Sequence, residues 1–328
     1  MRDKKKTILK PLRVLSLFDG ISCGQVALER AGIPIETYYA SEIDKYAISI
    51  TQYNYPNTIQ LGDVEKINFK QFEGKIDLLI GGSPCTNLSM NGNRKGLEGE
   101  ESRLFWEYAR AIKECNPKYF LLENVESMSE KDEEIISKEL GCYPCMINSS
   151  LVSAQNRRRY YWTNIKLEKF GLFNEKRSSI PQPKDKNIIL SDILLSGIGI
   201  GVERKGQIIS CVQTKADCLL ARNYKGFGNQ RMTAVLDASD KQTPYEIKDG
   251  KLKLDYKILN INLPNGYYKV RKLTPLEYER LQTLSDEYTQ FGKDGDNIIK
   301  ISNMQRYKAI GNGWTVDVIA HIFDYLKD

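Results

Sequence analysis

The first half of the chain alternates short apolar runs with amphipathic helical stretches, and this alternation restricts the fold more than any other feature of the sequence. The apolar runs occupy residues 13–18, 37–41, 76–80 and 118–122. Short apolar runs bounded by glycine and polar residues are typical of buried strands in a parallel sheet, with helices as the connections. We therefore expect an α/β fold. In such folds ligands bind beyond the carboxyl ends of the strands.

Composition limits the class of protein. The chain has 328 residues, of which 41% are hydrophobic, enough for one large domain and a smaller one. Its seven cysteines are scattered and odd in number, which argues against a disulfide framework and favours a reducing compartment. It has no apolar run of about 18 residues, and its charged start does not resemble a signal peptide. We expect a cytoplasmic protein.

Cys85 stands where the apolar run 76–80 breaks into a polar loop. Gly81, Gly82 and Pro84 end the run abruptly, so the thiol follows the carboxyl end of a strand. Position alone leaves two interpretations open, a nucleophile or a packed core cysteine. The chain has one histidine, His321, inside an apolar helical pattern. A Cys-His or Ser-His pair is therefore not expected.

A second strand end has the features of a nucleoside site. The run 13–18 leads into a turn with Gly20 and Gly24, followed by a helix that Gly32 closes. Glu42 ends the next strand, 22 residues after Gly20, where an acidic side chain can take both hydroxyls of a ribose. Asp63 follows a further short strand. It either binds the amine of an adenine or is a plain turn residue.

An acid and two arginines are expected near Cys85. The run 118–122 delivers Glu123 to the same sheet edge, where an acid beside a thiol suggests a proton donor. Arg157 and Arg159 are two residues apart on a predicted strand and so point to one face. If that face carries the site, both arginines converge on the substrate.

Positive charge is concentrated in the middle of the chain. Of the formal net charge of +6, residues 166–270 hold 18 Lys and Arg against 11 Asp and Glu, whereas the remainder holds 30 against 31. The strand-helix rhythm also stops there, which predicts a second, irregular β-rich domain. The stretch 221–231 interleaves basic, aromatic and glycine residues, including Arg222 and Lys225. This stretch either binds phosphates or forms the solvated tip of a hairpin.

Taken in order, these motifs resemble those of the DNA cytosine-5 methyltransferases. The resemblance covers nearly everything outside the middle domain, and its motifs are Phe18-Asp19-Gly20, Glu42, Gly62-Asp63, Ser83-Pro84-Cys85, Glu123-Asn124-Val125, Gln155-x-Arg157-x-Arg159, 271–282 and Gly311-Asn312-Gly313. It implies a Rossmann-like, mixed seven-stranded sheet with helices on both faces and an inserted target-recognition domain. We expect the catalytic domain at residues 1–165, the recognition domain at 166–270 and the C-terminal return at 271–328.

The resemblance also implies the chemistry and its residues. Cys85 would add to C6 of a flipped-out cytosine, Glu123 would hold N3 and supply its proton, and Arg159 would stabilise the adduct from the O2 side. Arg157, grouped with them, is expected to position the site. The methyl donor is S-adenosylmethionine, and no metal is required. The expected cofactor-binding residues are Phe18, Gly20, Ile21, Glu42, Ile43, Asp63, Val64, Pro84, Leu104, Asn312 and Trp314. The expected DNA-binding residues are Ser89, Arg94, Lys95, Arg222 and Lys225.

The expected partner is duplex DNA, bound by a monomer in a bacterial or phage-infected cell, as in a restriction-modification system. Three departures from the family pattern leave every reacting group in place: the turn FDGISCG, Thr86 after the cysteine, and the GNGW stretch at 311–314. One alternative is a tRNA cytosine-5 methyltransferase on the same fold, and another is a catalytically silent DNA-binding relative. A small-molecule dehydrogenase, suggested by the sheet alone, does not explain the motifs at Cys85, Glu123 and Arg157.

Overall fold

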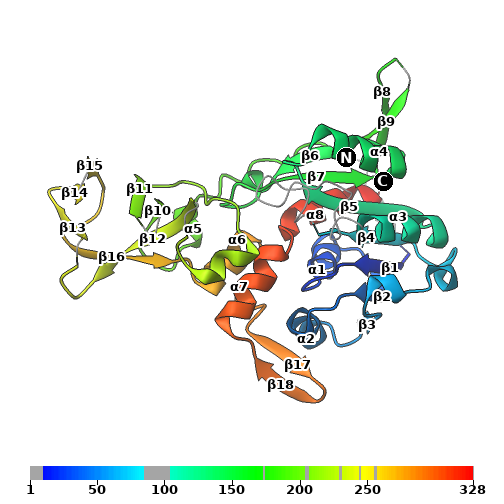
Figure 1. Cartoon of the computed structure of the whole chain (residues 1–328), viewed down its shortest axis with the longest axis horizontal. Coiled ribbons are helices and arrows are strands. Elements are labelled where there is room, and N and C mark those ends of the chain that lie inside the picture. Colours follow the sequence, from blue (N-terminus) through cyan, green and yellow to red (C-terminus); the bar gives the residue numbers. More distant parts are fainter. Residues whose placement is uncertain are drawn as a thin grey trace, which may run out of the picture.

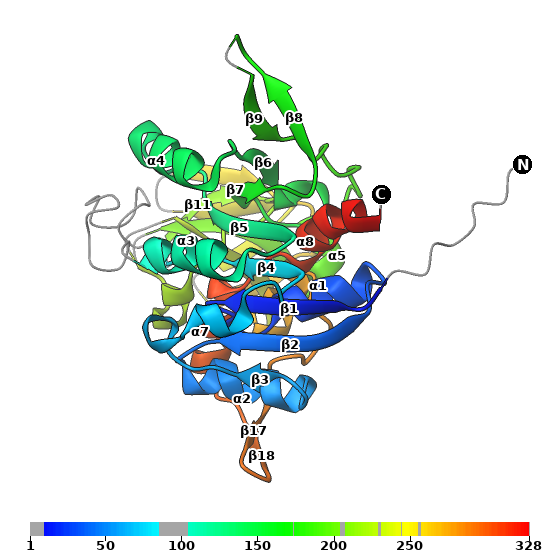
Figure 2. The ribbon, with the colours of Figure 1, turned by 90° about the vertical axis from the view of Figure 1, so that its right-hand side faces the viewer.

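A seven-stranded mixed sheet forms the centre of the larger part of the molecule (Figure 1; Figure 2). The computed structural model describes residues 10–84, 104–172, 174–203, 207–228, 231–243, 245–254 and 257–327. The strand order is β3-β2-β1-β4-β5-β7-β6, with β7 antiparallel to both of its neighbours and the other pairs parallel. The strands are β1 Leu12–Leu17, β2 Ile35–Ser41, β3 Ile59–Gln60, β4 Leu78–Gly81, β5 Tyr119–Val125, β6 Cys145–Asn148 and β7 Arg158–Thr163. This confirms the Rossmann-like prediction.

Helices cover both faces of this sheet, because successive strand residues point to opposite sides. Val14 and Ile80 pack in one core with α1, α2 and α8, whereas Leu15 and Leu79 pack in the other with α3 and α4. The helices are α1 Cys23–Arg30, α2 Lys45–Asn54, α3 Leu104–Cys115, α4 Glu130–Leu140 and α8 Val316–Phe323. The two cores explain why the strand segments read as continuous apolar runs.

A second sheet forms the narrower end of the molecule, at the left of Figure 1. Its seven strands pair antiparallel in the order β11-β10-β12-β16-β13-β14-β15 around a core of their own. They are β10 Ile198–Glu203, β11 Gln207–Cys211, β12 Met232–Ser239, β13 Tyr245–Lys248, β14 Lys251–Leu254, β15 Lys257–Asn260 and β16 Gly266–Lys272. The β-rich middle segment is therefore a regular sheet. The boundaries at 166 and 270 stay a prediction.

The remaining elements join or extend the two sheets. The hairpin of β8 and β9 projects beside β7, and the hairpin of β17 and β18 packs against α2 (Figure 1). These elements are β8 Leu167–Phe170, β9 Glu175–Ser178, β17 Phe291–Asp294, β18 Asn297–Lys300, α5 Leu190–Ile193, α6 Pro275–Leu281 and α7 Asn303–Asn312. The short 3-10 helices are η1 Val64–Lys66, η2 Phe69–Phe72, η4 Ser149–Leu151, η5 Ala221–Lys225 and η6 Asp324–Lys327.

Local sequence signals set the helix ends. Thr274 begins α6 by accepting a hydrogen bond from the Glu277 backbone N–H, and the Glu277 carboxylate accepts one from Thr274 N. With Pro275 in the first turn this is a capping box. After α1, Gly32 has a φ of +67°, a left-handed value that glycine adopts without strain. In the described part of the chain no helix has the length and apolar character needed to cross a membrane.

Candidate active site

Four strand ends meet at one edge of the first sheet. β1 ends before Phe18, β2 before Glu42 and β4 before Gly82, and Glu123 lies near the end of β5. Arg159 joins them although its strand runs the opposite way, because it opens β7, whereas the other residues close their strands. The topology therefore places the acid, the arginine and the turn before Cys85 side by side.

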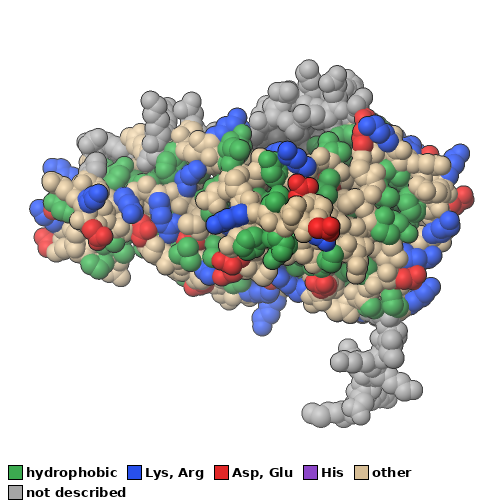
Figure 3. All heavy atoms as spheres, turned by 90° about the horizontal axis from the view of Figure 1, so that it is seen from below, with side chains coloured by type: hydrophobic (Ala, Val, Ile, Leu, Met, Phe, Trp, Pro, Cys, Tyr) green, Lys and Arg blue, Asp and Glu red, His purple; other side chains and the backbone are tan. Residues whose placement is uncertain are grey.

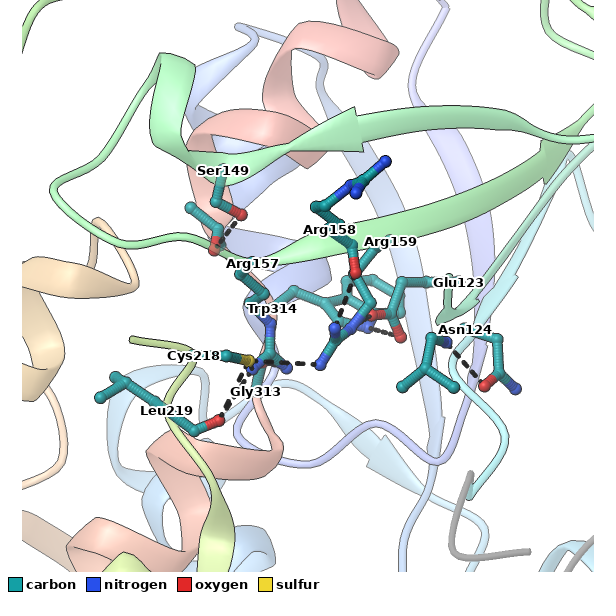
Figure 4. Close-up of polar contacts among 12 residues, drawn as sticks. Glu123, Asn124, Ser149, Arg157, Arg158, Arg159, Cys218, Leu219, Gly313 and Trp314 are labelled. Carbon is teal, nitrogen blue, oxygen red and sulfur yellow. Dashed lines mark hydrogen bonds and ion pairs between the residues drawn. The ribbon is translucent and has the colours of Figure 1, made fainter. Parts of the chain in front are cut away.

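Glu123 and Arg159 form an ion pair at this edge. Arg159 Nε lies 2.9 Å from Glu123 Oε1, and both side chains are largely buried, at 13% and 11% exposure. Glu123 pairs with Tyr161 across the sheet, so Arg159 is its diagonal neighbour on the same face. Trp314 Nε1 donates to Glu123 Oε2 at 3.2 Å (Figure 4). The carboxylate is thus held from two sides in one orientation.

The backbone leading to Cys85 is anchored beside this pair. Asn124 Nδ2 donates to Ser83 O at 3.3 Å and to Ser83 Oγ at 3.2 Å. Gly82 allows the close approach, since a Cβ there would stand 2.9 Å from Trp314 Nε1 and 3.0 Å from Glu123 Oε2. Cys85 itself lies outside the described residues, as do Ser89, Arg94 and Lys95.

The turn after β1 is joined to the acid after β2. Gly20 N donates to Glu42 Oε2, and the N–H groups of Ile43 and Asp44 donate to Oε1, each at 2.8 Å. Phe18 and Gly20 both have a φ of +58°, which is strained for Phe18 and is typical of functional turns. The Glu42 carboxylate is half-buried and retains lone pairs that can accept ribose hydroxyls.

The other predicted cofactor residues differ in polarity and in exposure. Ile43 exposes 76% of its side chain, which is unusual for so apolar a residue next to a buried sheet. Asp63 Oδ1 caps η1 by accepting from Glu65 N, and Val64 is buried beneath it. Ile21 is fully buried and supports the turn from below. Pro84, Leu104 and Trp314 are half-buried, and Asn312 is exposed. The Glu42 carboxylate, the glycine turn that it contacts and the exposed Ile43 side chain fit a nucleoside.

Arg157 has its guanidinium engaged by backbone. Its Nη1 donates to Leu219 O at 3.1 Å, and its Nη2 donates to Gly313 O at 3.0 Å. Arg157 is only 5% exposed, so these contacts are shielded from water. The side chain ties the entry of the second domain to the C-terminal motif beside Trp314 (Figure 4). Arg158 points the other way and pairs with Glu126.

A thiol from the second domain meets both arginines. Cys218 Sγ lies 3.5 Å from Arg157 Nη1 and 3.8 Å from Arg159 Nη2. Burial acts to raise the pKa of this thiol, but the two guanidinium charges outweigh burial and hold the pKa below its ordinary value. Sequence reasoning missed Cys218, because about 60 residues separate it from the arginines and its own neighbourhood has no motif.

Two buried glutamines complete the junction between the domains. Gln155 Nε2 donates to Gln282 Oε1 at 2.8 Å, and Gln155 Oε1 accepts from Leu219 N at 3.2 Å. Gln282 Nε2 donates to Gly313 O at 2.9 Å, and Thr315 Oγ1 donates to Gln282 Oε1 at 2.8 Å. Both glutamines are fully buried, and their hydrogen bonds join three distant segments. Both stood inside the quoted motifs without a predicted role.

Asp19 stood inside the quoted Phe18-Asp19-Gly20 motif without a predicted role. Burial raises the pKa of its carboxyl to about 6, although hydrogen bonds from Ser22, Ser16 and Tyr38 act in the opposite direction. Tyr38 OH donates to Asp19 Oδ1 at 2.8 Å. The carboxyl therefore titrates near neutral pH within the turn that carries Gly20.

Basic side chains surround a cavity beside Cys218. The cavity has a volume of about 260 Å³ and is lined by the 217–225 segment together with Gly228 and Arg231. Arg222 and Lys225 both belong to this lining. Figure 3 shows Lys and Arg side chains over the narrow end of the molecule, interspersed with acidic ones. Among the described residues no group of three or more His, Cys, Asp or Glu is arranged to hold a metal ion.

Comparisons with known proteins agree on one family. The family described as C-5 cytosine-specific DNA methylase matches residues 12–328. The orphan methyltransferase M.SPRI of Bacillus phage SPR is 35% identical over 199 residues, which are 56% of this chain and 45% of that protein. The type II methyltransferase M1.ScrFI of Lactococcus lactis subsp. cremoris is 27% identical over 326 residues, 96% of this chain and 78% of that protein.

The fold has solved counterparts. The Entamoeba histolytica methyltransferase EhMeth superposes with a TM-score of 0.66 at 18% identity, covering 97% of this chain and 98% of that one. An identity this low shows the fold alone. The matched region spans less than half the length of the phage methyltransferase.

Proposed function

The chain belongs to the C-5 cytosine-specific DNA methylase family, and from this premise we propose that it methylates C5 of a flipped-out cytosine in duplex DNA. Members of this family take the methyl group from S-adenosylmethionine. The observation that carries the proposal is the buried Glu123–Arg159 ion pair at 2.9 Å, beside the anchored backbone that leads into Cys85. An acid and a cation fixed together at the strand ends match the polar edge of a pyrimidine.

Cytosine C5 is a weak nucleophile, so the enzyme must first add electron density to the ring. The Cys85 thiolate would add to C6, forming the S–C6 bond while Glu123 delivers a proton to N3. Arg159 lies between Glu123 and Cys218 and would bind the O2 side of the ring, where negative charge develops. Once C5 has taken the methyl group that bound S-adenosylmethionine would supply, the C5 proton would pass to solvent, β-elimination would break the S–C6 bond and free the thiolate, and Glu123 would take the N3 proton back.

The cofactor would bind at the edge formed by the ends of β1 and β2. Glu42 would accept the ribose hydroxyls, Asp63 the adenine amine, and Ile43 would cover one face of the base. Bound there, S-adenosylmethionine supplies an electrophilic methyl group. The turn with positive φ at Phe18 and Gly20 would bring backbone within reach of that ligand.

Arg157 would act as a positioning residue. Its guanidinium donates hydrogen bonds to Leu219 O and Gly313 O, so it would hold the second domain against the site and would not reach the cytosine ring. Arg222 and Lys225 line the basic cavity beside Cys218 and would contact the phosphates around the extruded base.

Methyl incorporation separates this proposal from methylation of RNA. We expect purified protein to label duplex DNA and not tRNA, and Cys85→Ser to abolish labelling while the protein keeps its melting temperature. Bisulfite sequencing of a methylation-free bacterial host that expresses the protein would identify the modified base and its sequence context. Label that appears in tRNA alone would support the RNA alternative, and unchanged labelling by Cys85→Ser would contradict the nucleophile assignment.

A further inference from the structure

Arg231 lines the cavity next to the site and is held there by two side chains. Its Nε lies 3.4 Å from Asp217 Oδ2. Its Nη2 lies 3.1 Å from the side-chain amide of Gln213, whose oxygen must face the guanidinium because arginine only donates. In that orientation the Gln213 amide nitrogen donates to Ile200 O at 3.2 Å and to Thr233 Oγ1 at 2.8 Å.

The support behind Arg231 is itself rigid. Thr233 is 4% exposed, accepts from Asp217 N at 2.8 Å and lies 3.4 Å from Asp217 Oδ2. It stands at the start of β12, which pairs with β10 and β16 inside the second sheet. The two side chains that contact the Arg231 guanidinium thus belong to a network built on the sheet, although the Arg231 side chain stays 52% exposed.

The Gln213 contact engages one Nη2 hydrogen of Arg231, and Asp217 adds an ion pair at Nε. Within the described part of the chain the Nη1 group and one Nη2 hydrogen are left for a ligand in the cavity. An arginine oriented by its neighbours favours a ligand with two coplanar acceptors, and the major-groove edge of guanine offers two, O6 and N7. Phosphate can also bind the fork of an arginine, but a phosphate contact carries no sequence preference, so the methylation context distinguishes the two ligands.

The place of Arg231 links it to the target base. Asp217, its partner, immediately precedes Cys218, whose thiol contacts Arg159, and Arg159 pairs with Glu123. A nucleotide beside a cytosine held at Glu123 therefore lies next to the cavity that Arg231 lines.

We propose that Arg231, oriented by Asp217 and Gln213, reads a guanine close to the target cytosine and so helps to set the sequence specificity. The inference rests on the proposed function, because it requires a DNA substrate. It differs from the phosphate contacts assigned to Arg222 and Lys225, which carry no sequence information.

The test measures methylation context in the full-length protein. Wild type, Arg231→Ala and Arg231→Lys are expressed in a methylation-free host and analysed by bisulfite sequencing, and their rates are measured on duplexes that differ at one position. Wild type should require guanine at one fixed position near the cytosine. Both variants should lose about tenfold to a hundredfold of that preference while other positions keep theirs.

Two control variants show whether a loss of the guanine preference is specific to Arg231. Arg177→Ala, an exposed arginine on β9, should change neither context nor rate, and Arg222→Ala should weaken binding in every context and lower its salt dependence by about one charge. Thermal melting checks that each variant is folded.

The outcomes are separable. An unchanged context in both Arg231 variants overturns the inference, as does an equal loss in every context, which would make Arg231 a phosphate contact. A wild-type context without a required guanine also overturns it. Arg231→Lys with full discrimination would show that the planar fork is not needed. Wild type that methylates no DNA refutes the proposed function itself, whatever the variants do.

Discussion

Gly311 lies near the end of α7, where the helix meets the backbone of the 217–225 segment. A Cβ at this position would stand 2.5 Å from Ala221 N and 2.7 Å from Leu220 C. Both are backbone atoms, so no side-chain rotation relieves the clash. The substitution Gly311→Ala must therefore push α7 and the segment apart.

The size of the effect follows from these distances. Heavy atoms in ordinary contact lie about 3.5 Å apart, so the two backbones must separate by roughly 1 Å. That shift would stretch the hydrogen bonds that hold Leu219, which are 3.1 Å from Arg157 Nη1 and 3.2 Å to Gln155 Oε1, beyond useful length. Overpacking of this kind costs about 1–3 kcal/mol of stability, which lowers the melting temperature by roughly 2–10 °C.

Steady-state kinetics and melting test the prediction. We expect kcat/KM for duplex DNA to fall by about tenfold to a hundredfold, since misplacement by 1 Å is enough for such a loss. The affinity for S-adenosylmethionine, measured by calorimetry, should fall less than kcat/KM, because Glu42 and Asp63 follow β2 and β3 and, of the expected cofactor residues, Asn312 and Trp314 alone neighbour Gly311 in the sequence. Met304→Ala, an exposed change in the first turn of α7, is the matched control. A Gly311→Ala protein with wild-type kcat/KM and melting temperature would refute the reasoning.

Three further changes test other parts of the structure. Arg159→Ala should lower methyl transfer at least a hundredfold by removing the cation beside Glu123, whereas Arg158→Ala, on the opposite face, should stay within about twofold in the same labelling assay. Asp19→Asn should remove a pH dependence of the free energy of unfolding. The pKa of the Asp19 carboxyl is about 6 in the folded state and lower in the unfolded state, so the native state binds more protons. Wild type should therefore lose up to about 3 kcal/mol of stability as the pH rises from 4 to 7. Urea unfolding at several pH values measures this loss, and equal slopes in both proteins would contradict it. Thr274→Ala should lower stability by about 1 kcal/mol, read from urea midpoints, and no change would exclude a stabilising cap.

Much of the fold and part of the site can be predicted from local patterns in the sequence. The capping box at Thr274 and Glu277 is such a local feature, because each of its hydrogen bonds spans three residues. Glu123 and Arg159 were predicted to lie at the site edge, and the structure brings their side chains to 2.9 Å. Strand ends of one sheet meet at one edge whatever the connections between them, so this prediction needs only the strand pattern.

Other features depend on contacts that no local pattern encodes. Cys218 reaches Arg157 and Arg159 because the neighbouring Leu219 is held by hydrogen bonds to Arg157 and Gln155, about 60 residues away in the sequence. The guanidinium of Arg157 has the same sequence signal as that of Arg159, yet one is held by carbonyls and the other by a carboxylate. The partners of Arg157, Leu219 and Gly313, lie 62 and 156 residues away, whereas Glu123, the partner of Arg159, lies on the neighbouring strand.

The sequence by itself determined that apolar runs become a sheet, that glycines and acids follow the strand ends, and that the ordered motifs belong to cytosine-5 methyltransferases. These properties follow from side-chain periodicity and turn chemistry, which act over a few residues. Only the tertiary structure decided which arginine faces Glu123, how closely α7 approaches the 217–225 segment, and that Asp217 and Gln213 contact Arg231. The first depends on the pairing of β5 with β7, the second on the packing of α7 against the second domain, and the third on side-chain contacts within the second domain. None of these contacts is local in the sequence.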